Sequence, residues 1–134
     1  MRLVVDTGVF SAALSRRRRL AFKSQVARLA GNQIFLAAAT VAELRFGALV
    51  AEWGTPRRDR LEEAIAEATV VPVSDALLTR VAELRLACRH AGHPLADPAH
   101  ANDLWIATSA LHIAAGLVSA DAIFVDVPGL DLIR

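Results

Sequence analysis

The sequence predicts an α/β domain built on a parallel sheet. Short apolar runs alternate along the chain with longer segments of helical periodicity. The first run, Leu3-Val4-Val5, has no polar alternation, as expected of a strand covered on both faces. A length of 134 residues with 54% apolar composition suits one core rather than two. We expect a single domain over residues 1–134, with a central parallel sheet of four to five strands flanked by helices.

A helical segment is predicted over residues 9–14, directly after the first strand. An arginine run follows it, consisting of Arg16, Arg17, Arg18 and Arg19. Apolar residues at helical spacing continue from Leu20 to Ala30, so the arginines are placed at the start of a second helix, where they oppose its dipole. This run is interpreted either as a solvated basic face or as a phosphate-binding segment.

The second strand is expected at Ile34-Phe35-Leu36. The next helix is predicted to begin at Thr40, because the residues up to Glu43 match the capping-box pattern. On this pattern, Glu43 would fold back onto the helix start. Gly54 ends the helix, and another is predicted from Pro56 to about Ala68.

A third strand is predicted over residues 69–73. Because it contains Pro72, this strand is expected at the periphery of the sheet. Ser74 caps a helix whose apolar face is formed by Leu77, Leu78, Val81, Leu84 and Cys88. The proline-containing stretch from His93 to Ala101 is interpreted as a loop.

The last helix is predicted to begin at Asn102 or Asp103 and to end at Gly116. Leu117-Val118-Ser119 form the fourth strand. Two short apolar pieces follow at residues 123–125 and 130–133, and the second is expected to be an edge strand.

Composition narrows the function classes. The net charge of +1 gives no strong reason to expect a nucleic-acid partner, although charge is unevenly distributed. Cys88 is the only cysteine, which excludes an intrachain disulfide and a thiolate zinc site. No apolar run is long enough to span a membrane, and Asp6 interrupts any signal-peptide core. We expect a cytoplasmic protein without a membrane anchor.

Acidic residues follow strands or begin helices at several points along the chain. The set consists of Asp6, Glu43, Asp103 and Asp121. These positions share one edge of a doubly wound sheet, so the carboxylates are expected to converge there. Converging carboxylates repel one another unless a cation neutralises them, and hard oxygen ligands favour Mg²⁺ or Mn²⁺ over zinc. A divalent ion at such a site suits hydrolysis of a phosphodiester.

The chain resembles PIN domains, in particular the VapC-type toxins of type II toxin-antitoxin modules. The resemblance rests on Val4-Val5-Asp6-Thr7, Thr40-Val41-Ala42-Glu43-Leu44 with Phe46-Gly47, Asn102-Asp103-Leu104-Trp105-Ile106-Ala107, Ser119-Ala120-Asp121 with Phe124, and Val127-Pro128-Gly129-Leu130. It covers essentially the whole chain. Each motif is weak by itself, whereas four of them in order form a specific pattern.

The resemblance implies a Mg²⁺-dependent endoribonuclease that cuts RNA, held inactive by a VapB-type antitoxin and assembled as a homodimer. It assigns the metal to Asp6, Glu43, Asp103 and Asp121. Thr7 would orient a carboxylate or a water, and Asp126 is a secondary acid. A separate hypothesis, drawn from the arginine run itself, is that Arg16 to Arg19 hold the RNA backbone, with plain solubility as the alternative.

The sequence also allows other functional interpretations. A PIN-like module could bind RNA or antitoxin without cutting, and an antitoxin helix would suit apolar grooves around Phe22, Phe46 and Leu49. Asp6-Thr7-Gly8 also matches aspartic proteases, but no second triplet occurs. A phosphoaspartyl enzyme would need a lysine better placed than Lys23.

Some candidate residues receive no firm role from the sequence. The acid Asp97 and the histidines His93 and His100 are interpreted as loop residues. Trp105 is expected in the core, whereas Trp53 suits the core, an antitoxin contact or a platform for base stacking.

Overall fold

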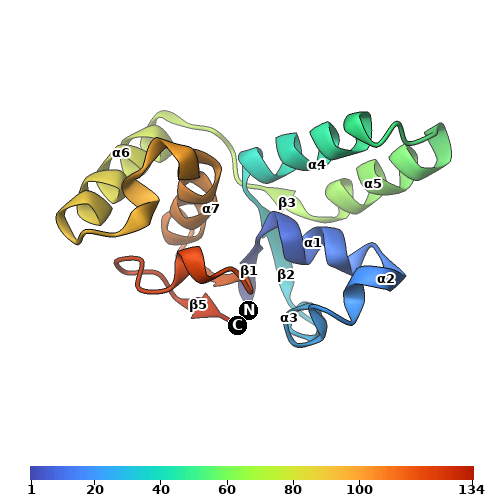
Figure 1. Ribbon diagram of the computed structural model, residues 1–134, viewed down its shortest axis with the longest axis horizontal. Coiled ribbons are helices and arrows are strands. Elements are labelled where there is room, and N and C mark those ends of the chain that lie inside the picture. The colour runs from blue at the N-terminus through green and yellow to red at the C-terminus, as the bar shows by residue number, and fades with distance from the viewer.

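The computed structural model describes all 134 residues and shows a five-stranded parallel sheet between two layers of helices (Figure 1). The strand order is β3-β2-β1-β4-β5, and each neighbouring pair is parallel. The strands are β1 (Arg2–Val5), β2 (Gln33–Leu36), β3 (Thr69–Val70), β4 (Gly116–Val118) and β5 (Leu132–Ile133). This confirms the predicted class and the edge positions of the third and last strands.

The helices divide between the two faces of the sheet. Helices α1 to α5 lie on one side, and α6 and α7 lie on the other (Figure 1). They are α1 (Thr7–Ala13), α2 (Arg16–Arg19), α3 (Lys23–Ala27), α4 (Ala38–Val50), α5 (Thr55–Glu67), α6 (Asp75–His90) and α7 (Ala101–His112). Three short 3₁₀ turns complete the chain: η1 (Pro94–Ala96), η2 (Pro98–His100) and η3 (Ala122–Phe124). None of the helices is both long and apolar enough to cross a membrane.

Strand β1 lies at the centre of the sheet and contributes to both cores. Because side chains alternate along a strand, Val4 points into one core while Leu3 and Val5 point into the other. All three are at most 1% exposed. The run of apolar residues without polar alternation is thus explained by burial on both faces.

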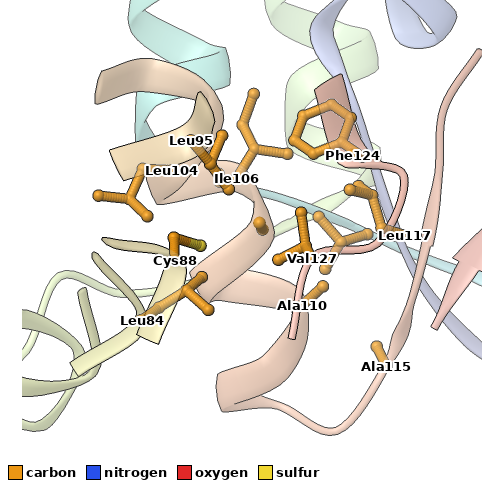
Figure 2. Close-up of a cluster of buried hydrophobic side chains, with 13 residues drawn as sticks. Leu84, Cys88, Leu95, Leu104, Ile106, Ala110, Ala115, Leu117, Phe124 and Val127 are labelled. Atoms are coloured by element: carbon orange, nitrogen blue, oxygen red, sulfur yellow. The ribbon is translucent and has the colours of Figure 1, made fainter. Parts of the chain in front are cut away.

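The core beneath α6 and α7 is built from medium-sized apolar side chains (Figure 2). Figure 2 shows Cys88 and Leu84 from α6 beside Ile106 and Leu104 from α7, with Phe124 closing one end. Cys88 is fully buried, as predicted. The opposite core packs α1, α4 and α5 on the sheet through Val9, Phe10, Leu36, Val41, Leu44, Ala48, Leu61, Ile65 and Val118.

The arginine run differs from its prediction. It does not begin one helix that continues to Ala30 but forms α2 alone, followed by a separate α3. Neither short helix contains a buried residue, and Leu20 is 80% exposed. Four adjacent cations at a helix start oppose the dipole, and α2 has no apolar residue to dock, so the helix does not extend.

Helix α4 begins earlier than predicted, at Ala38 instead of Thr40. Its N-cap is Ala37, without a side-chain cap bond. Thr40 is fully buried, and its hydroxyl hydrogen-bonds with that of Thr7. The predicted capping box is therefore wrong, and the Glu43 side chain can contact residues outside its own helix.

Other boundaries shift by smaller amounts. Helix α7 begins at Ala101 and ends at His112, so Gly116 does not stop it; Ala114 adopts the left-handed conformation instead (φ 53). Gly116 opens β4, where an added Cβ would lie 2.6 Å from Cδ1 of Ile133. In α6, Ser74 caps the helix as predicted, accepting a hydrogen bond from the Leu77 amide at 3.1 Å.

Some apolar and strand predictions were also wrong in detail. Leu78 on α6 is 48% exposed and does not belong to the buried face. Strand β3 stops at Val70, short of the predicted residue 73. The apolar piece at residues 123–125 falls mostly in the 3₁₀ turn η3. Helix α5 begins one residue early, at Thr55, with Gly54 as its N-cap.

Candidate acidic active site

Asp6 lies where the central strand β1 ends and α1 begins. Its Oδ1 accepts a hydrogen bond from the Val9 amide at 2.8 Å, and its Oδ2 accepts one from the Ser119 hydroxyl. The residue is 8% exposed. Burial raises the pKa of the Asp6 carboxyl, and the bonds from Ser119 and Val9 partly offset the increase. Both oxygens are thus fixed by elements that pack in the core.

Ser119 is a site residue for which sequence reasoning assigned no role. It is fully buried after β4 and also accepts a hydrogen bond from the Asp121 amide at 3.0 Å. One hydroxyl therefore links Asp6 to the turn that carries Asp121. The available signal was a serine directly after a buried apolar run and two residues before an acid, the pattern of a local side-chain turn.

Glu43 lies on α4 opposite Thr7, the first residue of α1. The Thr7 hydroxyl donates to Oε1 of Glu43 at 3.2 Å. Burial raises the pKa of the Glu43 carboxyl, the Thr7 bond lowers it, and repulsion by Asp103 and Asp6 raises it further. The sequence pattern had suggested a carboxylate turned toward its own helix start, whereas the structure turns it toward α1.

Asp103 stands in the first turn of α7, with Oδ2 3.5 Å from Nδ1 of His100. Burial and the nearby Asp121 raise the pKa of the Asp103 carboxyl, and His100 partly offsets this. Asp121 is exposed and caps η3, where its Oδ1 accepts from the Ile123 amide at 3.0 Å. His100, interpreted from sequence as a loop residue, thus borders the site.

The four carboxylates are close enough to affect one another. Asp121 and Asp103 both raise the pKa of Asp6, Asp6 and Asp103 raise that of Glu43, and Asp121 raises that of Asp103. The fold therefore gathers acids from four distant segments at one edge of the sheet. No three of the acidic, histidine or cysteine side chains lie within reach of a single ion as they are placed.

The donor chemistry nevertheless fits a hard divalent cation. All candidate ligands are carboxylate oxygens, the donors preferred by Mg²⁺ and Mn²⁺. The raised pKa values of Asp6, Glu43 and Asp103 reflect burial and mutual repulsion, which a bound cation would relieve. The side chains would have to move toward one another to share one ion.

Two further acids considered from the sequence, Asp126 and Asp97, lie apart from the four interacting carboxylates. Asp126 is exposed in the left-handed conformation (φ 62), and Asp97 caps η2 by accepting from the Ala99 amide at 2.8 Å. Neither contributes to the pKa shifts of Asp6, Glu43 or Asp103.

His93 has a structural role in the loop. Its Nε2 donates to the Val125 carbonyl at 2.8 Å, and its Nδ1 accepts from the Leu95 amide at 3.0 Å.

Both tryptophans are half-buried. Trp105 was expected in the core, and the structure buries it only in part.

All four residues of the arginine run are exposed, and they differ in their contacts. Arg18 Nη1 donates to Oγ of Ser11 at 3.1 Å, and Arg19 Nε donates to the Ala13 carbonyl at 3.1 Å. Arg18 also lines a cleft of about 710 Å³ whose wall includes Thr7 and Glu43. Part of the basic run thus borders the acidic site.

Comparison with known proteins identifies a family. The model of the PIN domain matches residues 3–130. Ribonuclease VapC5 from Mycobacterium tuberculosis (strain ATCC 25618 / H37Rv) is 31% identical over 128 residues, which span 94% of this chain and 87% of that protein.

Solved structures show the same fold. VapBC-5 from Mycobacterium tuberculosis superposes with a TM-score of 0.71 at 27% identity, over 99% of this chain and 98% of that one. VapBC2 from Rickettsia felis, bound to a DNA fragment from its promoter, gives a TM-score of 0.74 at 21% identity over the same shares of the two chains. By its sequence and its fold, this chain belongs to the PIN domain family and, within it, to the VapC type.

Proposed function

We propose that this protein is a metal-dependent endoribonuclease toxin that hydrolyses RNA phosphodiester bonds. The observation that carries the proposal is the gathering of Asp6, Glu43, Asp103 and Asp121 at one sheet edge, where repulsion within the set raises the pKa values of Asp6, Glu43 and Asp103. Its relative from Mycobacterium tuberculosis is a ribonuclease, which supports RNA as the substrate.

These four carboxylates would hold Mg²⁺, with Mn²⁺ as a possible substitute. Such an ion, when bound, activates water as the nucleophile and offsets negative charge that develops on a phosphodiester. Ser119 and the Val9 amide hold both oxygens of Asp6 in place. Thr7 holds Glu43 away from its own helix start, and the exposed Asp121 is the acid most open to substrate. Asp126 is kept as a secondary acid.

The arginine run is proposed to hold the RNA backbone beside the acids. All of its guanidinium groups are exposed, and Arg18 lines the cleft that reaches Glu43. Guanidinium groups form bidentate contacts with phosphate, so binding through them would depend steeply on salt.

A VapB-type antitoxin is the proposed inhibitory partner, and we propose a homodimer in the cytoplasm. The solved relatives are VapBC pairs, which supports such a partner. On α4, Phe46, Leu49 and Val50 are 65–67% exposed and share one face at helical spacing. This face would suit an amphipathic antitoxin helix. Phe22, also expected in the docking groove, is instead half-buried against the toxin's own core.

The test is cleavage of RNA with Mg²⁺, with EDTA, and with Mg²⁺ restored. We expect cleavage by the parent in Mg²⁺, loss in EDTA, recovery on restoration, and no cleavage by folded Asp103→Asn. Adding the purified antitoxin should suppress the activity. Cleavage that is unaffected by both EDTA and Asp103→Asn would contradict the proposal.

A second candidate is a PIN-like module that binds RNA or antitoxin without cutting. The open spacing of the acids, with no three within reach of one ion, is the observation that favours it. A folded parent that binds RNA but leaves it intact in both Mg²⁺ and Mn²⁺ would support this alternative.

A further inference from the structure

A cleft of about 710 Å³ extends from the acidic site between α1, α4 and α5. Thr7 and Glu43 line its inner end, where β1 and β2 lead into helices. Trp53 and Arg57 line it near the connection between α4 and α5, which lies far from the sheet (Figure 1). The cleft therefore connects the acids to a surface well outside the site.

Charge changes sign along this cleft. Helices α4 and α5 run in opposite directions, tied by the Arg45–Glu62 ion pair at 2.7 Å (Figure 1). Of the α5 residues that line the cleft, Glu67 is nearest the sheet, whereas Arg57 and Arg60 are nearest the outer end. Arg18 adds a third guanidinium from α2. The inner end is thus acidic and the outer end is basic.

The outer arginines are available for a ligand. Arg57 and Arg60 are exposed, and neither forms an ion pair or a side-chain hydrogen bond. The Arg57 guanidinium lies 3.9 Å from the centre of the Trp53 ring, and Trp53 packs against the toxin's core. The ring holds the guanidinium plane in place, which reduces the entropy that Arg57 would lose on binding. Its outer face and N–H edge remain free.

Of the two outer arginines, Arg57 lies farther from the acids. Helix α4 continues for seven residues beyond Glu43, or roughly 10 Å along its axis, and Trp53 lies three residues past its last residue, Val50. Arg57 follows in the first turn of α5, so its backbone lies well away from the acids. Any substrate group that it holds belongs to a more distant part of the same strand.

We propose that this cleft guides a single strand of RNA out of the acidic site, with Arg57 and Arg60 as positioning residues for nucleotides away from the cut. The inference rests on the proposed ribonuclease function. A cleft of about 710 Å³ has the size that accommodates a small ligand, which suits a short single-stranded segment. Phosphate contacts and stacking on the Arg57 plane would both contribute to binding.

Charge favours RNA over a protein segment in this position. The carboxylates at the inner end would bind a metal cation, and the guanidinium groups at the outer end would bind phosphates. A metal-dependent nuclease with its RNA substrate contains both a cation and phosphates. The apolar face of Phe46, Leu49 and Val50, by contrast, points away from this cleft, since none of these residues lines it.

The first test measures RNA binding without cleavage. A fluorescein-labelled single-stranded RNA is titrated in EDTA, and its anisotropy is followed at several salt concentrations. Arg57→Ala and Arg60→Ala should each weaken binding by about five- to tenfold and lower the salt slope by about 0.7. Arg58→Ala is the matched control, because Arg58 is exposed on the same helix but does not line the cleft. It should change binding less than about twofold.

A second variant separates charge from geometry. Arg57→Lys keeps the cation but loses the planar group over Trp53, so it should recover the salt slope while recovering only part of the affinity. In Mg²⁺, Arg57→Ala should raise KM and leave kcat unchanged, because the residue lies too far from the reacting phosphate to act on it.

Two results would overturn the proposal. Equal losses for Arg57→Ala and Arg58→Ala would show that only overall charge matters. Unchanged RNA binding by Arg57→Ala, together with weaker binding of the purified antitoxin, would assign the cleft to the protein partner. Failure of the parent to cut RNA in Mg²⁺ would contradict the proposed function alone, because the EDTA titration tests the cleft independently of cleavage.

Discussion

The two charged regions of this molecule are built in opposite ways. Asp6 is 8% exposed, mounted on the central strand and bonded through both carboxylate oxygens. The arginine helix α2 has no buried residue, and Arg16 and Arg17 form no side-chain hydrogen bond or ion pair. The fold therefore fixes Asp6 in place and leaves most of the basic run free.

This difference distinguishes the carboxylates, which are proposed to catalyse cleavage, from the arginines, which are proposed to bind RNA. Gathering carboxylates in a partly buried site costs stability, because burial and mutual repulsion both raise their pKa values. Exposed arginines cost little to maintain. A costly arrangement held by specific bonds indicates a geometric requirement, such as a metal site, whereas exposed cations require only proximity to a phosphate.

The largest effect is expected from replacing the buried acid Asp6. Asp6→Asn should reduce RNA cleavage by on the order of a thousandfold, since a metal site supplies several kcal/mol of transition-state stabilisation. Single-turnover cleavage in Mg²⁺ measures the effect. Asp97→Asn is the matched control outside the interacting set and should change the rate far less. Comparable losses in both variants would contradict a specific role for Asp6.

Ser119→Ala tests the support of that acid. Removing the hydroxyl frees Oδ2 of Asp6 and leaves the Asp121 amide without its partner. We expect cleavage or metal affinity to fall by about 10- to 100-fold, the usual cost of losing a bond that orients a ligand. Ser109→Ala is a control, because that buried serine bonds only to the Trp105 carbonyl in its own helix. Full activity of Ser119→Ala would indicate that Asp6 needs no such support.

The cost of the acids can be measured as pH-dependent stability. Because the folded pKa values of Asp6, Glu43 and Asp103 are raised, the native state retains protons that the unfolded chain has lost. Their contribution to the free energy of unfolding therefore decreases as pH rises from the ordinary values of 3.8 and 4.5 through the raised ones.

Asp103→Asn should consequently stabilise the metal-free protein, by about 2–4 °C in Tm at pH 7. Its advantage over the parent should shrink as pH falls below the raised pKa. Thermal melts in EDTA across this pH range measure both effects, and added Mg²⁺ should raise Tm of the parent more than that of the variant. A variant less stable than the parent at pH 7 would contradict the repulsion inferred for the cluster.

The smallest effect is expected from the free cations. Replacing Arg16 to Arg19 with Ser should weaken RNA binding and flatten its salt dependence, by about 0.7 in slope for each lost contact. Replacing only Arg16 and Arg17 serves as a comparison, since Arg18 alone of the four lines the cleft. Unchanged affinity and slope in the fourfold variant would assign this run to solubility.

Much of the fold could be predicted because its signals are local. The run Leu3-Val4-Val5 identifies a strand buried on both faces, and Ser74 marks a helix start that the structure confirms. Alternation of strands and helices then restricts the chain to a parallel sheet with acids at one edge. The family resemblance rests on the same local motifs.

Features that depend on distant contacts could not be predicted in this way. Glu43 matched a capping box, but its hydrogen-bond donor is Thr7, 36 residues away. Ser119 donates to Asp6 across 113 residues, so its neighbours in sequence gave no sign of the bond. Gly116 was interpreted as a helix stop, whereas the side chain of Ile133 on β5 is what requires a glycine there. Leu20 followed helical spacing without any surface to pack against.

The central claim, that four distant carboxylates form one metal site, is tested most directly by locating a bound ion. Crystals grown with Mn²⁺ allow the ion to be placed from its anomalous scattering. We expect a peak bounded by Asp6, Glu43, Asp103 and Asp121, with the side chains drawn closer together than in the metal-free structure, and no peak in Asp103→Asn. Absence of this peak at Mn²⁺ concentrations that support RNA cleavage, or a peak elsewhere on the molecule, would contradict the account.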